Sequence, residues 1–122
     1  MSKRSSQSVA PELERQLYAA FFQMLADMRN AKEVETFLKY FLSESELSIY
    51  TKRFAVAVML EQGKSYEYIR EALKVSTATI SSIAEHLRSD GISLALHKLK
   101  VERWADVMSE KLMQMFGGNS KK

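Results

Sequence analysis

The sequence predicts an all-α protein of about six helices. The 122-residue chain has one proline and four glycines, and alternating apolar and polar runs, which would favour strands, are scarce. Apolar residues instead recur at intervals of three and four, and several of these stretches follow a residue that can cap a helix. The length fits one domain. We expect a single helical domain over residues 11–116, between disordered tails at residues 1–10 and 117–122.

The first two helices are predicted from their apolar spacing. Pro11 suits the first turn of a helix, where its missing N–H is not needed. The stripe that follows it consists of Leu13, Leu17, Phe21, Leu25 and Met28. A break at Asn30 and Ala31 precedes a second stretch. Its apolar residues share one helical face: Val34, Phe37, Leu38, Phe41 and Leu42.

A third helix is predicted from Glu44 to Gln62. Ser43 can cap its first turn, while Glu46 reaches back to the N–H of the cap, which makes a capping box. The helix is apolar on more than one side, so we expect it at the centre of the core. Gly63 is placed to end it.

Residues 65–88 read as two short helices separated by a tight turn, a helix-turn-helix unit. In the first, Tyr66 to Leu73, the residues on the buried face are Ile69, Ala72 and Leu73. Ser76 caps the second by accepting a hydrogen bond from the backbone N–H of residue 78 or 79. The buried face of this second helix holds Ile80, Ile83, Ala84 and Leu87.

The other face of the second helix is small and polar, with Ala78, Ser81, Ser82 and Glu85 outward and Thr77 at the rim. Such a helix can enter a major groove, where Ser and Thr bond phosphates or base edges and an alanine contacts a thymine methyl. The sequence therefore indicates DNA recognition.

A structural alternative stays open, because any antiparallel helix pair in a small helical domain would show two stripes and a serine cap. Arg70 stands where a generic helix-turn-helix often has a small residue, and Lys74 where the turn often has glycine. A lysine at positive φ would cost on the order of 1 kcal/mol. We therefore expect a turn with ordinary dihedral angles.

Beyond the second helix, Asp90 and Gly91 signal a turn or helix end, and a last amphipathic segment is predicted from about Ile92 to Phe116. Its apolar stripe consists of Val101, Trp104, Ala105, Met108, Leu112 and Met115. Together with the first helix this is more apolar surface than one helix-turn-helix core needs, which favours burial against a second subunit. Packing within the chain stays the alternative.

Composition excludes several classes of protein. Without cysteine there is no disulfide, thiolate zinc site or cysteine nucleophile, and His86 and His97 alone make no metal cluster. No phosphate loop or catalytic motif is present, so we expect no enzyme. No apolar run is long enough to span a membrane, and the first ten residues lack a signal peptide's apolar stretch, so we expect a cytoplasmic protein.

The net charge of +3 is mildly basic. Basic and acidic residues are nearly balanced within the helix-turn-helix window, so one copy should bind DNA weakly without sequence preference. A specific complex would need two copies and flanking cations. The candidates are Lys52, Arg53, Lys98, Lys100 and Arg103.

Residues 37–88 carry a more specific pattern, FLKYFLSESELSIYTKRFAVAVMLEQGKSYEYIREALKVSTATISSIAEHL. Its most specific elements are L-S-x-x-E at Leu42, Ser43 and Glu46, then Arg53, Gly63 and A-T-I-S at Ala78 to Ser81, and a basic residue at Arg70 also fits. This pattern resembles the tryptophan repressor family. The resemblance implies an intertwined homodimer whose two reading helices enter successive major grooves of a palindromic operator, with half-sites about 34 Å apart.

The resemblance also implies a corepressor pocket, which this chain matches only in part. Arg53 matches the arginine that lies against the tryptophan, and Ser43 the hydroxyl residue near the ligand's amino group. Ser82 replaces the second stacking arginine, Ile83 the small glycine after it, and His86 the serine at the ligand's amino end. We therefore expect no tryptophan corepressor and no other cofactor. Ser43, Arg53, Ile83 and His86 remain the candidate pocket for an unidentified effector.

We predict a homodimeric helix-turn-helix transcription regulator, a repressor that binds double-stranded DNA. The predicted DNA-binding residues are Lys64, Arg70, Lys74, Ser76, Thr77, Ala78, Thr79, Ser81 and Ser82. The alternative is a helical protein-interaction module that keeps the fold without binding an operator. A DNA-binding domain in replication or chromosome organisation would share the motif. The salt dependence of binding distinguishes the DNA-binding repressor from the protein-interaction module, because only phosphate contacts weaken steeply with ionic strength.

Overall fold

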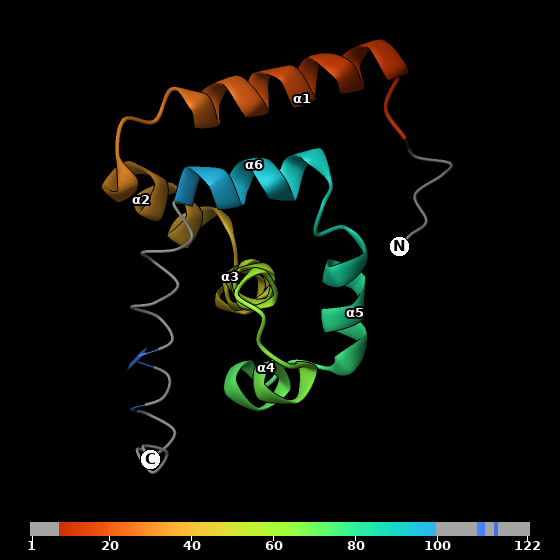
Figure 1. Ribbon diagram of the computed structural model, residues 1–122. Helices are drawn as coiled ribbons and strands as arrows, with labels where there is room; N and C mark the ends of the chain where they lie inside the picture. The colour runs from red at the N-terminus through yellow and green to blue at the C-terminus, as the bar shows by residue number, and fades with distance from the viewer. Residues whose placement is uncertain (1–7, 100–109, 112–113, 115–122) are drawn as a thin grey trace. The chain divides into compact units, whose positions relative to one another are not determined.

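Six α-helices are present in the part of the chain that the structure, a computed structural model, describes: residues 8–99, 110–111 and 114 (Figure 1). The chain divides into two compact units, residues 1–44 and 45–122. The predicted all-α class is confirmed. The prediction of one domain over residues 11–116 stays a prediction, and the predicted stripe from Val101 to Met115 lies outside the described residues.

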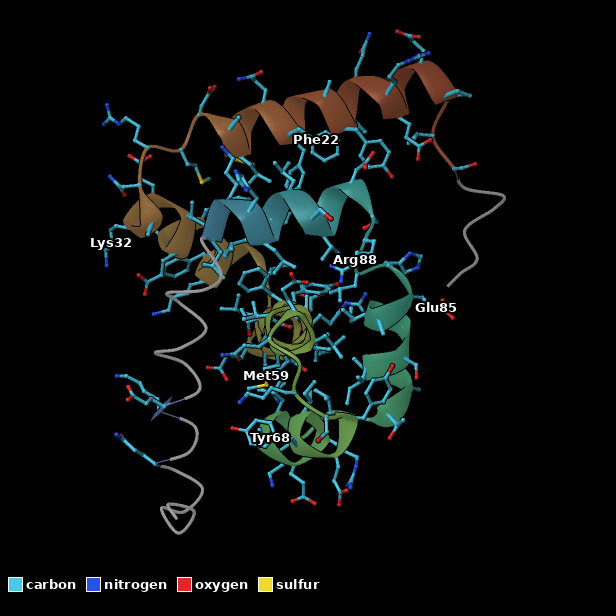
Figure 2. The ribbon with its side chains drawn as sticks, in the orientation of Figure 1. Phe22, Lys32, Met59, Tyr68, Glu85 and Arg88 are labelled. Atoms are coloured by element: carbon cyan, nitrogen blue, oxygen red, sulfur yellow. The ribbon has the colours of Figure 1, made fainter. Side chains whose placement is uncertain are left out.

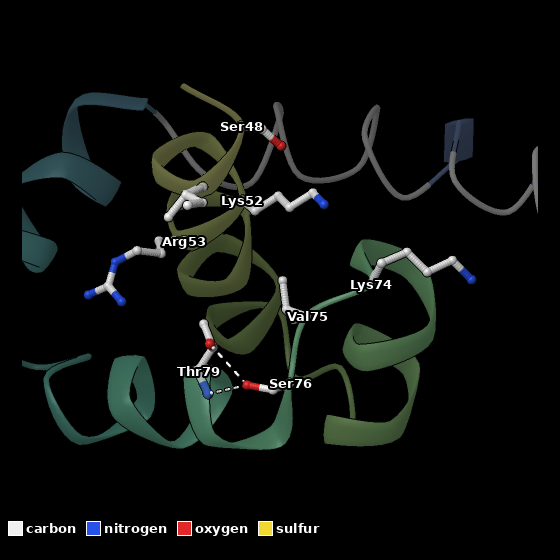
Figure 3. Close-up of a pocket in the computed structure, with 8 residues that line it drawn as sticks. Ser48, Lys52, Arg53, Lys74, Val75, Ser76 and Thr79 are labelled. Carbon is white, nitrogen blue, oxygen red and sulfur yellow. Dashed lines mark hydrogen bonds between the residues drawn. The ribbon is translucent and has the colours of Figure 1, made fainter. Parts of the chain in front are cut away.

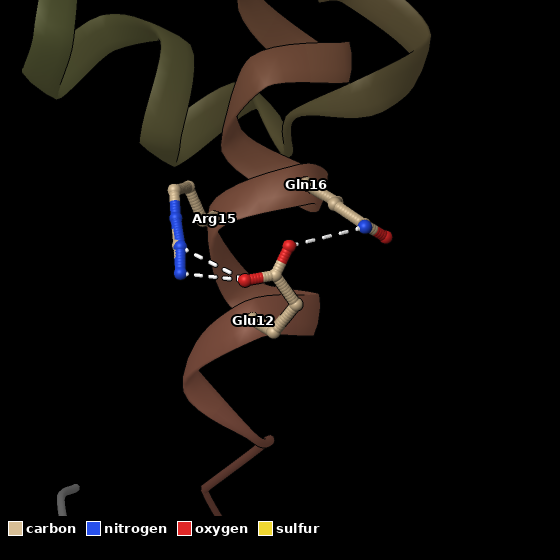
Figure 4. Close-up of polar contacts among 3 residues, drawn as sticks. All are labelled: Glu12, Arg15 and Gln16. Carbon is tan, nitrogen blue, oxygen red and sulfur yellow. Dashed lines mark hydrogen bonds and ion pairs between the residues drawn. The ribbon is translucent and has the colours of Figure 1, made fainter.

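The first unit contains α1 (Pro11–Ala26) and α2 (Ala31–Phe41). Pro11 occupies the start of α1, as predicted. The Glu12 carboxylate accepts hydrogen bonds from two residues that lie one turn further along α1 (Figure 4). Arg15 donates at 2.6 and 3.1 Å, and Gln16 donates at 3.4 Å. These contacts are exposed and contribute little stability each.

Two hydrogen bonds to Glu33 hold the break between α1 and α2. The Asn30 side chain accepts from the N–H of Glu33 at 3.0 Å, and the Glu33 carboxylate accepts from the N–H of Arg29 at 2.9 Å. The first contact satisfies a backbone donor in the first turn of α2, and the second ties the residue before the cap to that turn, so the chain can restart a helix there.

An aromatic cluster joins the two helices of this unit. The rings of Phe37 and Phe41 stack at 4.8 Å, and Phe21 of α1 lies 6.4 and 6.0 Å from them. Even so, no residue of α1 or α2 is buried. The first unit therefore presents large apolar side chains at its surface.

The second unit packs α4 (Tyr66–Leu73), α5 (Thr77–Glu85) and α6 (Asp90–Leu99) around α3 (Glu44–Glu61), which Figure 1 shows end-on. Five successive residues of α3, from Ala55 to Met59, are buried, so the helix is enclosed on all sides at this level, as predicted. Met59 points towards α4 (Figure 2). The core consists of Val56, Ala57, Val58, Met59, Ile69, Ile80, Ile83 and Leu96.

Glycine ends α3, as predicted. Gly63 has φ +87°, a conformation that side-chain-bearing residues rarely adopt. The N–H of Gly63 donates to the carbonyl of Leu60 and that of Lys64 to the carbonyl of Met59, both at 3.0 Å. Carbonyls that have no partner within the helix at its end are thereby satisfied.

The interpretation of Asp90 and Gly91 as a turn or helix end is wrong, because these residues form the first turn of α6. The Ser89 hydroxyl accepts from the N–H of Ile92 at 3.4 Å and so caps the helix. Asp90 then lies where a negative charge is favoured by the helix dipole. None of the described helices is long and apolar enough to cross a membrane.

Candidate nucleic-acid interface

Helices α4 and α5 form the predicted helix-turn-helix unit, and each begins at a serine cap. Ser65 accepts from the N–H of Tyr68 at 3.0 Å, and Ser76 accepts from that of Thr79 at 3.1 Å. On the inner side, Ile69 of α4 and Ile80 of α5 are fully buried. Burial of such side chains fixes the angular position of both helices about their axes, and therefore determines which residues of α5 face outward.

The outward face of α5 consists of small side chains. Thr77, Ala78 and Ser82 are exposed, whereas Ser81 is half-buried. Glu85, one turn further, projects away from the core (Figure 2). The predicted groove-reading residues thus lie on one surface, with Ser81 at its edge, and the small side chains of this surface allow close approach to a DNA groove.

The turn between the helices differs from the prediction. Lys74 has φ 58° and ψ 45°, in the left-handed region, so the expectation of ordinary dihedral angles is wrong. Its N–H donates to the carbonyl of Arg70 at 3.0 Å and so ends α4. A non-glycine residue in this region costs about 1 kcal/mol. The tight approach of α5 to α4 imposes this conformation on a lysine.

Two further predicted cations are Lys64, which precedes α4, and Arg70, which belongs to it. Lys64, before the helix, places its ammonium 5.2 Å from the centre of the Tyr68 ring, a cation–π contact. Arg70 is exposed and lies 3.8 Å from Glu71. Both remain near the surface, where long side chains can reach a phosphate.

A pocket of about 300 Å³ lies between α3 and the turn, and we call it the turn pocket (Figure 3). It is lined by Ser48, Ile49, Lys52, Arg53, Lys74, Val75, Ser76 and Thr79. Ser76 donates a hydrogen bond from its hydroxyl to that of Thr79 at 3.1 Å while accepting from the Thr79 amide. This double contact holds the start of α5 against the pocket.

The residues predicted to contact DNA include Lys74, Ser76 and Thr79, and the structure brings all three to the turn pocket. Ser48 and Ile49 also line it and are not among the predicted site residues. These residues come from α3, far from the turn in sequence, and only the packing of α3 against α4 and α5 brings the two segments together. No local pattern could have indicated that proximity.

A second pocket, of about 210 Å³, lies between α3, α5 and α6. Arg53 and Ile83, two of the candidate effector residues, line it together with Phe54, Ala57, Ile92, Ala95 and Leu96. We call it the α6 pocket. Of the other two candidates, His86 is the exposed cap residue at the end of α5 and does not line it, and Ser43 belongs to the first unit.

Several predicted features fall outside this arrangement. Lys98 is exposed on α6, whereas Lys100 and Arg103 lie outside the described residues. No group of three or more histidine, cysteine or acidic residues with metal-binding geometry occurs in residues 8–99. The site is therefore described by its shape, its hydroxyl groups and its cations.

Comparison with known proteins supports the same assignment. A protein-family model, described as Trp repressor protein, matches residues 16–100, which is more than half of the chain. No curated protein and no solved structure matches the chain. The matched segment contains α1 to α6 apart from the first residues of α1. This chain is therefore a member of the Trp repressor family of DNA-binding transcription regulators.

Proposed function

We propose that the protein is a repressor that binds a palindromic operator as a homodimer. The observation that carries this proposal is the exposed face of α5, where Thr77, Ala78 and Ser82 form a shallow surface beside the cations of the turn. A recognition helix of this kind reads base edges while the flanking cations contact phosphates. Occupancy of an operator then blocks access of the transcription machinery to the same DNA.

Dimerisation is supported by the apolar surface of the first unit. Leu17, Tyr18 and Phe22 are between 53% and 60% exposed. Large apolar patches on a protein surface mark sites of association. A second copy provides a matching patch and a second α5, and two copies double the number of phosphate contacts that one nearly neutral helix-turn-helix unit supplies.

We further propose that operator binding does not use tryptophan as corepressor. Ile83 is 4% exposed and fills space beside Arg53 in the α6 pocket. Among the described residues that line this pocket, Arg53 is the one charged residue. The ammonium group of a bound amino acid would lose its hydration without gaining a carboxylate partner there. An effector of the α6 pocket would instead be apolar with at most one acidic group.

The experiment that tests the proposal is selection of bound fragments from a DNA library at near-physiological salt, without added ligand. Enrichment of a palindrome whose half-site centres lie about 10 base pairs apart is the expected result. The control is the same selection with Ser82→Glu, which places a negative charge on the reading surface. Enrichment of no sequence by the unmodified protein, with or without tryptophan, would contradict operator binding and favour the protein-interaction alternative.

A further inference from the structure

The turn pocket has an unbalanced charge. Lys52, Arg53 and Lys74 line it, and none of its described lining residues is acidic. Among the described residues, no ion pair to an acidic group is found for any of these three cations. The chain as a whole has 18 basic and 15 acidic residues, so three cations and no anion among the described lining residues depart from the general balance. Its potential favours a negatively charged ligand.

Two of the three cations are directed to one side. In Figure 3 the side chains of Lys52 and Lys74 extend in the same direction, whereas the guanidinium of Arg53 points the opposite way. Arg53 also lines the α6 pocket. The ammonium groups of Lys52 and Lys74 are therefore the charges that an anion at the turn would meet.

The backbone at Lys74 adds an independent observation. A left-handed residue that ends a helix is ordinarily glycine or asparagine, which adopt this conformation with less strain. Here a lysine occupies the position, and what it adds over glycine is a second lysine cation on the lining of the pocket that Lys52 also lines. Strained backbone that is retained next to a pocket is a feature of functional sites.

Hydroxyl groups complete the donor set. Because Thr79 accepts its hydrogen bond from Ser76, its own hydroxyl hydrogen can be donated to a ligand. Ser48 contributes a second hydroxyl from α3. Ammonium and hydroxyl donors from different elements that line one pocket suit a tetrahedral oxyanion. A planar carboxylate is instead recognised best by the arginine fork, and Arg53 is turned away.

We propose that the turn pocket is a binding site for a phosphate group, held by Lys52 and Lys74 with the hydroxyls of Ser48 and Thr79. The inference rests on the proposed function, which it deepens by adding α3 to the interface. Two sources provide this chemistry. One is a backbone phosphate of bound DNA, and the other is a free small molecule that carries a phosphate.

The test has two arms, both using the full chain. In the first, inorganic phosphate is titrated without DNA against sodium chloride of equal ionic strength, and NMR follows the amide signals of Ser76 and Thr79 and the side-chain signals of the two lysines. The same titration is made with the double variant Lys52→Gln/Lys74→Asn. Asparagine retains the left-handed conformation with little strain, and circular dichroism checks that the variant folds.

In the second arm, affinity for the selected operator is measured as a function of salt for the unmodified protein, Lys52→Gln and a control, Lys32→Gln. Lys32 is exposed on α2, in the other unit. Its replacement by glutamine removes the same charge as Lys52→Gln. Loss of one phosphate contact lowers the slope of log K against log salt by about 1 per protomer. We expect this reduction for Lys52→Gln and an unchanged slope for Lys32→Gln.

The outcomes separate the sources. Phosphate-specific shifts that the double variant loses would identify a site for a free phosphorylated ligand, and a reduced salt slope without such shifts would identify a DNA phosphate as the occupant. A protein that binds its operator with equal slopes in all variants and shows no specific phosphate shifts overturns the inference. Shifts that persist in the double variant also overturn it. If the unmodified protein binds no DNA, the proposed function fails, and the first arm still decides on the pocket.

Discussion

Ser76 and Thr79 are joined by two hydrogen bonds at the start of α5. The Ser76 hydroxyl accepts from the Thr79 amide and donates to the Thr79 hydroxyl, both at 3.1 Å. The first contact satisfies a backbone donor that the helix itself leaves unpaired. The second fixes the direction of the Thr79 side chain. One serine thus stabilises the helix and orients a group at the edge of the turn pocket.

Replacement of this cap separates folding from DNA binding. We expect Ser76→Ala to lower the free energy of unfolding by about 1 kcal/mol, because the Thr79 amide loses its partner. Ser76→Asp keeps a capping oxygen and should unfold like the original protein. Its added negative charge should nevertheless weaken operator binding. Urea unfolding and fluorescence anisotropy measure the two effects, and equal stability of Ser76→Ala and the original protein would contradict the assigned cap.

At Lys74, stability and affinity should move in opposite directions. Lys74→Gly removes the strain of a left-handed residue that bears a side chain, so we expect the free energy of unfolding to increase by up to about 1 kcal/mol. The same change removes a cation of the turn pocket and should lower the salt dependence of DNA binding. Calorimetry measures the stability of the variant, and fluorescence anisotropy measures the salt dependence of its DNA binding on the same preparation. A Lys74→Gly protein that is less stable than the original would show that a contact of the lysine side chain stabilises the fold by more than the backbone strain costs.

The two described glycines provide a matched pair of substitutions. An added Cβ meets no atom within 4 Å at Gly63 or Gly91, and only Gly63 has a positive φ. We therefore expect Gly63→Ala to destabilise the protein by about 1 kcal/mol through backbone strain alone. Gly91→Ala, in the first turn of α6, should stabilise it by about 0.5–1 kcal/mol. Chemical denaturation of both variants gives the signs, and a shared sign would refute this interpretation.

Charge on the reading face should abolish operator recognition without affecting the fold. Ser82 is exposed on α5, so Ser82→Glu leaves the core intact and places a carboxylate against DNA. We expect loss of specific binding with an unchanged circular dichroism spectrum. Ser93→Glu, which makes the same change at an exposed position of α6, is the control and should bind normally. Retention of binding by Ser82→Glu would mean that another face of α5 reads the DNA.

The first unit should hold the dimer together. Phe22 is 60% exposed on α1, and we expect Phe22→Arg to shift the protein towards monomer in analytical ultracentrifugation, because a charge in an apolar interface is not solvated. Gln23→Arg is the control on the same helix. Gln23 already donates to Asp27 at 2.9 Å, and an arginine there retains an acidic neighbour. Dimers of equal strength in both variants would place the interface elsewhere.

The sequence was sufficient to predict the features that depend on local chemistry. The limits of α4 and the cap at Ser76 follow from hydroxyl groups next to apolar stripes, and the inner face of α5 from spacing alone. Gly63 was identified because few other residues end a helix with positive φ. Each of these signals lies within a few residues of the feature that it predicts.

What the sequence did not reveal depends on contacts between distant segments. Lys74 adopts the left-handed conformation because α5 must return against α4, and this tertiary requirement overrides the local preference of lysine. Asp90 and Gly91 were misinterpreted because the cap at Ser89 was overlooked, although a serine before an acidic residue is a recognisable start signal. The turn pocket requires α3 beside the turn, which spacing in sequence does not encode.

The division of α5 into a buried and an exposed face has a consequence for how this regulator can change. Ile80 and Ile83 carry the packing of the helix, while the exposed Thr77, Ala78 and Ser82 lie outside the core. Substitutions at these outward positions leave the free energy of folding nearly unchanged. Under the proposed function, new operator preferences can therefore arise one residue at a time, without compensating changes in the core. A library randomised at those three positions should yield mostly folded proteins that differ in the DNA they select.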